Sequence, residues 1–211
     1  KGEAGGLVGA NGVGKSTLLR ILVGLNTGFQ GDVMVNNIPL EKKNLKTIRK
    51  NIGYVFQDAD SQLFMSTVFD DVAFAPRNYG MSEAEVNEKT MEALKVVHIE
   101  QLKDKQIYKL SGGEKKLASI ATILSTEPDV ILMDEPSVAL DPKNRRNLIN
   151  ILNRLNQAKI IASHDLNMIM DTCERTILLS DGKIIKDGNT KEILLDKELM
   201  EESGLELPLG Y

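Results

Sequence analysis

The sequence is poor in three features that would each point to a class of protein: cysteine, an excess of positive charge, and long apolar runs. Its single cysteine, Cys173, excludes an internal disulfide and a metal site built from cysteines, which fits a reducing compartment. The longest apolar runs, such as VILM at 130–133, are far shorter than the roughly 20 residues that cross a bilayer. No signal-like apolar stretch stands at the N-terminus. We therefore expect a soluble, cytosolic protein.

The balance of charge is acidic. A net charge of −4 argues against a protein that binds nucleic acid, because such proteins usually carry a basic face. The chain has 211 residues, of which 42% are hydrophobic and 27% charged, so it is long enough for one complete globular domain with a subdomain.

Short runs of β-branched and aliphatic residues alternate with helix-like stretches along most of the chain. This is the pattern of an α/β domain with a mostly parallel sheet. The candidate strands are residues 6–8, 32–35, 52–56, 130–133 and 159–163. Near the C-terminus, TILLSDGKIIK is typical of a hairpin whose turn is formed by Asp181 and Gly182.

The strands stop between residues 76 and 126, where we expect a helical insertion. Residues 82–97 start with a capping box from Ser82 to Glu85. Helical spacing then places five residues on one face: Val86, Thr90, Ala93, Leu94 and Val97. We therefore divide the chain into an α/β core (1–75 and 127–189), a helical subdomain (76–126) and a C-terminal helical tail (190–211).

GANGVGKST at 9–17 is the first motif that carries chemistry. Gly9, Gly14, Lys15 and Ser16 satisfy the pattern G-x-x-x-x-G-K-[ST] between a candidate strand and a helix-like stretch. The glycines let the loop wrap a phosphate, the lysine reaches the β and γ phosphates, and the serine hydroxyl can ligate Mg²⁺. A chance match is rare because glycine averages about 7% of residues. We predict a nucleotide-binding loop, and we include Asn11, Gly12 and Thr17 in it.

VILMDEPS at 130–137 is an apolar run that ends in two acids, Asp134 and Glu135. A buried strand of a parallel sheet presents such carboxylates at its C-terminal edge, where ligands bind. Asp134 suits a Mg²⁺ ion through water, and Glu135 can polarise an attacking water as general base, a role worth roughly 10²- to 10⁴-fold in rate. Two acids after a strand are common by themselves, but their position downstream of a P-loop favours the functional interpretation.

LSGG at 110–113 leads into a second helix whose N-terminus would attract anions. One chain does not need two phosphate sites for one nucleotide. Together with the P-loop, the acidic strand end, Gln57, SVALD at 137–141 and His164, the motif closely resembles the ATP-binding cassette (ABC) ATPases over essentially the whole chain. The resemblance implies a P-loop NTPase fold, with a mostly parallel sheet core and an ABC-type helical subdomain.

The resemblance also implies that the functional unit is a pair of cassettes. In the family, the signature residues contact the γ phosphate held by the P-loop of the partner subunit, so that two cassettes enclose two ATP molecules head to tail. The signature residues here are Ser111, Gly112 and Gly113. Asp141 is expected to cross the dimer interface. The partner can be an identical chain or a related one.

The remaining family positions complete a catalytic site. Gln57 is expected beside the attacking water and beside Mg²⁺, whose other contacts are Ser16 and Asp134. His164 is expected to hydrogen-bond the γ phosphate and to help orient Glu135, although a core histidine is the alternative. ATP and Mg²⁺ are therefore the expected cofactors.

The N-terminal region departs from the family pattern. Relatives carry a further β segment ahead of the P-loop strand, with an aromatic side chain that stacks on adenine, and we expect this segment to be truncated before Lys1. Tyr54 or Phe29 is the alternative partner of the base. Gly5 and Gly6 also stand where larger apolar residues are usual, and glycine weakens strands.

Three classes of function compete: a transporter ATPase, a soluble cassette ATPase of DNA maintenance or translation, and a P-loop kinase. DNA-maintenance relatives insert long coiled coils before the signature, whereas only a short segment separates Gln57 from Ser111 here. Translation relatives usually join two cassettes in one chain. A kinase has no use for the signature or for His164. We therefore expect a transporter subunit at the cytoplasmic face of the membrane.

Residues 55–76, VFQDADSQLFMSTVFDDVAFAP, resemble the energy-coupling factor importers of cobalt, nickel and vitamins. The tail ESGLELPL resembles the end of that group's ATPases, where it helps to hold two ATPases together. A transmembrane coupling subunit is expected to dock near Gln62, Leu63 and Phe64, with the last two as an exposed apolar anchor. The alternative is that Phe64 packs under the helical insertion.

Overall fold

The structure is a computed structural model that describes residues 2–210, and the chain folds into two compact units. Unit 1 consists of Lys1–Tyr54, Asp129–Ser137 and Leu155–Tyr211, and unit 2 of Val55–Pro128 and Val138–Arg154. The boundaries differ from the expected ones. The helical unit begins at Val55 rather than at residue 76, and it takes in residues 138–154, which the sequence assigned to the core.

The main sheet has six strands within residues 2–210, in the order β4-β5-β6-β1-β7-β8. Strands β5, β6, β1 and β7 run parallel, and β8 is antiparallel to β7, so the expected mostly parallel sheet is confirmed. The bounds are β1 Ala4–Gly9, β4 Ile52–Val55, β5 Val130–Asp134, β6 Ala158–Ala162, β7 Arg175–Ser180 and β8 Lys183–Asn189. Of the strand predicted at 32–35 only β2, Met34–Val35, forms, and it pairs with β3, Ile38–Pro39, in a separate ribbon.

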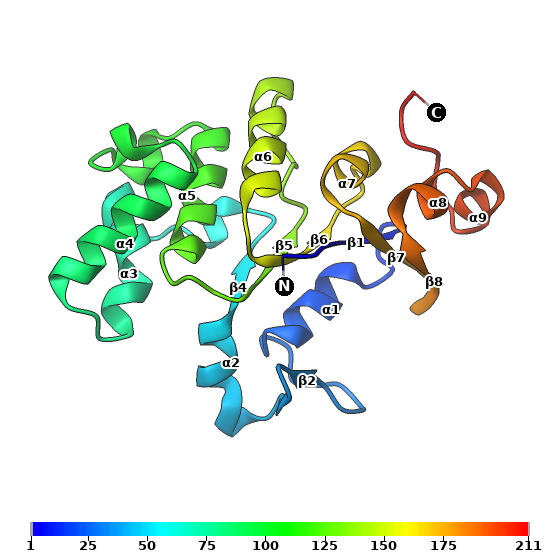
Figure 1. Cartoon of the computed structure of the whole chain (residues 1–211), viewed down its shortest axis with the longest axis horizontal. Helices are drawn as coiled ribbons and strands as arrows, with labels where there is room; N and C mark the ends of the chain where they lie inside the picture. Colours follow the sequence, from blue (N-terminus) through cyan, green and yellow to red (C-terminus); the bar gives the residue numbers. More distant parts are fainter. Residues whose placement is uncertain (1, 211) are drawn as a thin grey trace. The chain divides into compact units, whose positions relative to one another are not determined.

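Strand β1 lies inside the sheet and receives a helix on each face (Figure 1). Helix α1, Lys15–Leu22, covers one face, and α7, Leu166–Thr172, covers the other. A Cβ atom on Gly6 would lie 2.6 Å from Cγ2 of Ile169 on α7 and 3.0 Å from Oγ1 of Thr176 on β7. The glycine at position 6 is therefore explained, because a larger residue would push against Ile169 of α7, whereas a Cβ atom on Gly5 would meet only the Lys159 carbonyl at 3.8 Å.

Strands β7 and β8 form the predicted hairpin. Asp181 and Gly182 both have positive φ, 48° and 71°, as a two-residue type I′ turn requires. Helices α8, Thr190–Leu194, and α9, Lys197–Glu202, follow. The tail behind them is held by Asn167 of α7, whose Nδ2 donates to the Leu209 carbonyl at 3.0 Å while Oδ1 accepts from the Leu209 N–H at 2.9 Å. The remaining helical segments of unit 1 are η1, Lys42–Asn44, and α2, Leu45–Asn51.

Unit 2 is built on helices α3, Val68–Asn78, α4, Glu83–Val96, and α5, Gly112–Leu124, which pack side by side (Figure 1). The capping box of Ser82 and Glu85 is present, and all five residues predicted on one face of α4 are buried. Unit 2 also contains α6, Pro142–Arg154, and three short 3₁₀ turns: η2 Ala59–Ser61, η3 Glu100–Leu102 and η4 Ile107–Lys109. Among residues 2–210, no helix is both long enough and apolar enough to span a bilayer.

Candidate nucleotide-binding site

The P-loop connects β1 to α1 in unit 1. Gly14, which precedes α1, has a φ of +107°, a backbone conformation that residues with a Cβ atom rarely adopt. Lys15 is buried, and its Nζ donates to the Gly9 carbonyl at 2.7 Å and to the Ala10 carbonyl at 3.2 Å. Burial lowers the pKa of Lys15, although the carboxylates of Glu135 and Asp134 act in the opposite direction. The ammonium is thus held against the loop, where a phosphate would offer it stronger acceptors.

Asp134 stands at the end of β5 and is fully buried. Ser16 Oγ, on the first turn of α1, donates to Oδ1 at 2.7 Å, and the Tyr54 hydroxyl, on β4, donates to Oδ2 at 3.0 Å. The predicted pair of Ser16 and Asp134 is therefore brought together. Both contribute oxygen atoms, which are the ligands that Mg²⁺ prefers.

The contact between Tyr54 and Asp134 was missed by sequence reasoning, which offered Tyr54 only as an alternative partner of the base. The Tyr54 side chain is only 6% exposed, so the ring is not available for stacking on a base, and that interpretation is wrong. Burial raises the pKa of Tyr54 to about 12, which keeps the hydroxyl protonated as a hydrogen-bond donor to Asp134. The sequence pattern predicted the strand that contains Tyr54, but it carries no signal for this hydrogen bond.

Glu135 and His164 form a contact at the ends of β5 and β6. Nδ1 of His164 lies 2.8 Å from Oε2 of Glu135, and the His164 N–H donates to the same carboxylate at 3.1 Å. Ser163 Oγ, which the sequence did not single out, also donates to Oε2 at 3.1 Å. Glu135 itself has φ +47°, a conformation unusual for a residue other than glycine and often found at functional sites.

The exposure of the two side chains differs. Glu135 is buried, whereas the side chain of His164 is 59% exposed. With Nδ1 directed to the carboxylate, Nε2 is the ring nitrogen left for a ligand. Unit 1 therefore presents a lysine, a serine–aspartate pair and a glutamate–histidine pair at the C-terminal ends of its parallel strands.

The signature motif begins helix α5 of unit 2. Ser111 is the N-cap: its Oγ accepts from the Glu114 N–H at 3.3 Å, and Glu114 Oε2 accepts from the Ser111 N–H at 2.7 Å. The Ser111 N–H lowers the pKa of Glu114 most strongly, and Lys105 adds to the effect. Ser111 and Gly112 are exposed. The helix N-terminus therefore presents its dipole to solvent, as an anion site requires.

Asp141 precedes α6 and lies close to the signature in the same unit. Its Oδ1 accepts from the Asn144 N–H at 2.9 Å, and its Oδ2 accepts from Asn144 Nδ2 at 2.6 Å. A Cβ atom on Gly113 would lie 2.7 Å from that same Nδ2. A side chain at the second glycine of the signature would thus displace the amide of Asn144, a contact that sequence reasoning missed.

The predicted docking segment exposes one of the two apolar residues that were expected to be exposed. Phe64 is 65% exposed and packs edge-on against Phe74 of α3, with ring centroids 4.8 Å apart, so the alternative of a Phe64 packed under the helices is wrong. Leu63, however, is only 6% exposed and belongs to the core, which overturns its assignment to an exposed anchor. Asp71 fixes the turn by accepting from the Phe64 and Met65 N–H groups at 3.2 and 3.1 Å.

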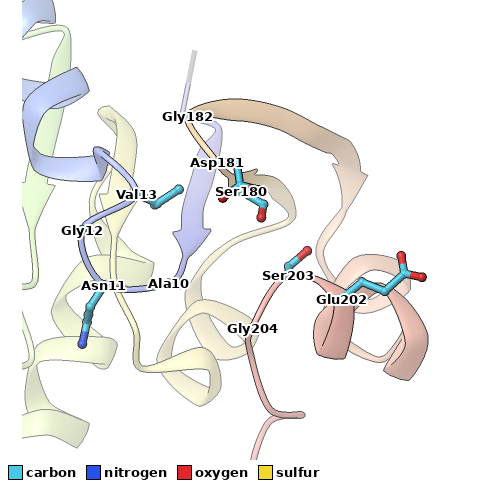
Figure 2. A pocket seen from close by; sticks show the side chains of 10 residues that line it. All are labelled: Ala10, Asn11, Gly12, Val13, Ser180, Asp181, Gly182, Glu202, Ser203 and Gly204. Carbon is cyan, nitrogen blue, oxygen red and sulfur yellow. The ribbon is translucent and has the colours of Figure 1, made fainter.

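A pocket of about 620 Å³ lies behind the P-loop in unit 1 (Figure 2). Three segments line it: residues 10–13 of the loop, residues 180–182 of the hairpin turn and residues 202–204 after α9. The lining includes the carboxylates of Asp181 and Glu202 and no basic residue, so the pocket is poorly suited to phosphate. Lys15 is not among the lining residues.

The predicted site residues are thus divided between the two units. Unit 1 holds Gly9, Asn11, Gly12, Gly14, Lys15, Ser16, Thr17, Asp134, Glu135 and His164. Unit 2 holds Gln57, Ser111, Gly112, Gly113 and Asp141.

Comparison with known sequences identifies one family. The profile of the family described as ABC transporter matches residues 1–138. A protein of Geobacter sulfurreducens with the provisional name ABC transporter ATP-binding protein is 48% identical over 209 residues, covering 99% of this chain and 84% of the relative. The energy-coupling factor transporter ATP-binding protein EcfA of Carboxydothermus hydrogenoformans is 41% identical over 206 residues, covering 96% and 76%.

Solved structures give the same result. CbiO1 from Clostridium perfringens, described as part of the ABC transporter complex CbiONQ, matches with a TM-score of 0.85 and 36% identity, over 96% of this chain and 83% of that one. The ATP-binding cassette MJ0796, in a dimeric post-hydrolysis state bound to ADP and Pi, matches with a TM-score of 0.79 and 31% identity, over 90% and 86%.

Proposed function

This chain belongs to the ABC transporter family of ATP-hydrolysing cassettes, and on that premise we propose that it is the ATPase subunit of an importer of the energy-coupling factor type. The proposed cargo is a metal ion such as cobalt or nickel, or a vitamin. The similarity to EcfA and CbiO1 supports this subgroup, together with the QLF and DVAF elements of residues 62–74. The proposed location is the cytoplasmic face of the membrane, bound to membrane subunits.

The observation that carries the ATPase part of the proposal is the grouping of Lys15, the Ser16–Asp134 pair and the Glu135–His164 pair in unit 1. We assign the proton of the attacking water to the Glu135 carboxylate, and the 2.8 Å contact between His164 Nδ1 and Glu135 Oε2 supports this role by orienting the carboxylate. The water oxygen then bonds to the γ phosphorus as the bond to the β–γ bridging oxygen breaks, releasing ADP and phosphate. Lys15 binds the phosphates, and Nε2 of His164 can contact the γ phosphate.

Mg²⁺ is the proposed metal. Ser16 Oγ and Asp134 Oδ1, 2.7 Å apart, are donors of the type that the ion prefers, and Gln57 is assigned to the same ion from the family resemblance. Residues 2–210 contain no group of three or more histidine, cysteine or acidic side chains that could hold a metal by themselves. This fits an ion that keeps several waters and is held largely by substrate phosphates. Bound Mg²⁺ would neutralise charge on the transferred phosphoryl group.

Two cassettes are proposed to act together, head to tail. We assign Ser111 and Gly112 to the partner's ATP, and their exposure at a helix N-terminus supports a role in binding an anion. Asp141 is also exposed, and its backbone and side-chain hydrogen bonds with Asn144 lower its pKa, so it stays ionised. The dimeric state of MJ0796 supports the same arrangement.

The proposed contact with the membrane subunit is the aromatic pair formed by Phe64 and Phe74. Both side chains are exposed although they stack on each other, and large apolar residues in such a position commonly dominate binding energy. Leu63 supports this surface from beneath. Gln62 is bonded to α5 and is not free to contact a partner with its side chain amide.

Affinity purification from native membranes in mild detergent tests the proposed function. The tagged chain is expected to bring down a polytopic membrane protein and a second cassette. Phe64→Asp should lose the membrane protein but keep the cassette, whereas Tyr108→Asp, which changes another exposed aromatic residue of unit 2, should keep both. Recovery with nucleic acid or ribosomes, and with no membrane protein, would instead identify a soluble cassette ATPase.

A further inference from the structure

Residues 56–62, which contain Gln57, are fastened to the signature helix α5 by a buried lysine. Nζ of Lys116 donates to the Gln57 carbonyl at 2.7 Å and to the Phe56 carbonyl at 2.9 Å. Lys116 is only 3% exposed. A buried ammonium is costly unless its N–H groups meet acceptors, so moving the loop backbone away from α5 would take two acceptors from a buried charge.

Gln62 closes the other end of the same segment. Its Nε2 donates to the Ser119 carbonyl at 2.7 Å and to Thr122 Oγ1 at 2.8 Å, both on α5. Its Oε1 accepts from the Phe56 N–H at 3.1 Å. One side chain therefore ties the beginning of the segment to its end and ties both to the helix. All of these contacts lie within unit 2.

A third contact is of a different kind. Lys115, next to Lys116, pairs with Asp60 at 2.5 Å, but the Asp60 side chain is 63% exposed. Exposed ion pairs contribute little because water and salt screen them. The adjacent lysines therefore offer a matched comparison: Lys116 holds the loop backbone, whereas Lys115, whose side chain is 21% exposed, pairs with an exposed carboxylate.

We propose that Lys116 and Gln62 form a clamp that makes the Gln57 loop and the signature helix move as one body. Lys116 follows Ser111 by five positions, about 7.5 Å along a helix that rises 1.5 Å per residue. The clamp therefore joins the residue assigned to this chain's own ATP, Gln57, to the residues assigned to the partner's ATP, Ser111 to Gly113. This step rests on the proposed two-cassette function.

The clamp couples the two ATP sites of the dimer. When Gln57 shifts toward its own nucleotide, the shift displaces the signature of the same chain toward the partner's nucleotide. Lys116 is accordingly a positioning residue, because it contacts backbone carbonyls rather than ATP. Its loss should lower the cooperativity of ATP hydrolysis more than it weakens nucleotide binding to one chain.

The first test compares ATP titrations of hydrolysis for the wild type, Lys116→Met and Lys115→Met. Methionine keeps the length and apolar stem of lysine but cannot donate hydrogen bonds to the Phe56 and Gln57 carbonyls. For Lys116→Met we expect about a tenfold loss of kcat and a Hill coefficient that falls to about 1. Lys115→Met should stay within about twofold of the wild type. Lys116→Arg, which can still donate to both carbonyls, should recover part of the cooperativity. A Lys116→Met enzyme with normal kcat and normal cooperativity would overturn the proposal.

A second test uses hydrogen exchange and does not depend on hydrolysis. In a Glu135→Gln background, added ATP should protect the backbone amides of residues 55–63 and 111–117 together. Adding Lys116→Met should separate the two responses while residues 82–97, on α4, keep the exchange of a folded helix. If both segments still respond together, the clamp does not transmit motion. If ATP fails to protect residues 10–17 in the Glu135→Gln protein that keeps Lys116, the proposed nucleotide site is wrong, and the result says nothing against the clamp itself.

Discussion

Replacing Leu63 and Phe64 one at a time by alanine should give opposite results, although the two residues are neighbours. Leu63 is 6% exposed, and its truncation removes roughly three carbon atoms, each worth about 0.8 kcal/mol of transfer free energy. The cavity adds to this loss, so we expect Leu63→Ala to lower the free energy of unfolding by about 3 kcal/mol. Phe64 is 65% exposed and loses mainly its edge-on contact with Phe74, which is worth about 1 kcal/mol or less.

Urea denaturation of the isolated protein measures both values directly. Binding should show the opposite order of effects from stability. Phe64→Ala should lose the membrane subunit although its free energy of unfolding is nearly unchanged. A mutant that keeps the side-chain volume, Leu63→Met, should restore most of the stability lost in Leu63→Ala. The reasoning is refuted if Phe64→Ala costs as much stability as Leu63→Ala, because the exposed ring would then be part of the core.

Further predictions concern a buried hydroxyl, a strand glycine and the signature. Among the described residues, Thr90 Oγ1 is the only buried side-chain polar atom without a hydrogen-bond partner. Thr90→Val should therefore raise the free energy of unfolding, measured by denaturant titration, by about 1 kcal/mol. A lower free energy of unfolding would contradict this. Gly6→Ala should lower the free energy of unfolding by about 1–3 kcal/mol, because the new Cβ would lie 2.6 Å from Cγ2 of Ile169. An unchanged denaturation midpoint would mean that α7 moves to accept the methyl group at no cost. Ser111→Arg should abolish hydrolysis but leave calorimetric ATP binding to a single chain nearly intact, and a comparable loss of binding would argue against a site shared between two chains.

The sequence predicted the elements that depend on local pattern. Periodicity and turn chemistry predict the strand before the P-loop, the strand that ends in Asp134, the hairpin turn at Asp181 and the capping box at Ser82. All four are present. The pairing of Glu135 with His164 also agrees with the family resemblance. The strands, the turn and the capping box need only a few neighbouring residues, so a single sequence is sufficient to indicate them, whereas the pairing across 29 positions came from the resemblance.

Contacts between distant residues could not be predicted in the same way. Tyr54 meets Asp134 across 80 positions, and Lys116 reaches the Gln57 carbonyl across 59. Nothing in local periodicity encodes such hydrogen bonds. The direction of Leu63 was missed for a related reason: polar neighbours suggested an exposed turn, but the 3₁₀ turn η2 and the hydrogen bonds to Asp71 direct Leu63 inward and only Phe64 outward.

The central claim is that Glu135 is the general base of an ATP-driven cassette dimer, and Glu135→Gln tests it most directly. The amide keeps the size of the side chain but cannot take a proton from water. ATP turnover should be measured beside molecular mass, by light scattering after size exclusion in the presence of ATP and Mg²⁺. The account predicts that turnover falls by about 10²-fold or more while ATP binding is retained and an ATP-bound dimer accumulates. Near-normal turnover, with no dimer at saturating ATP, would contradict it.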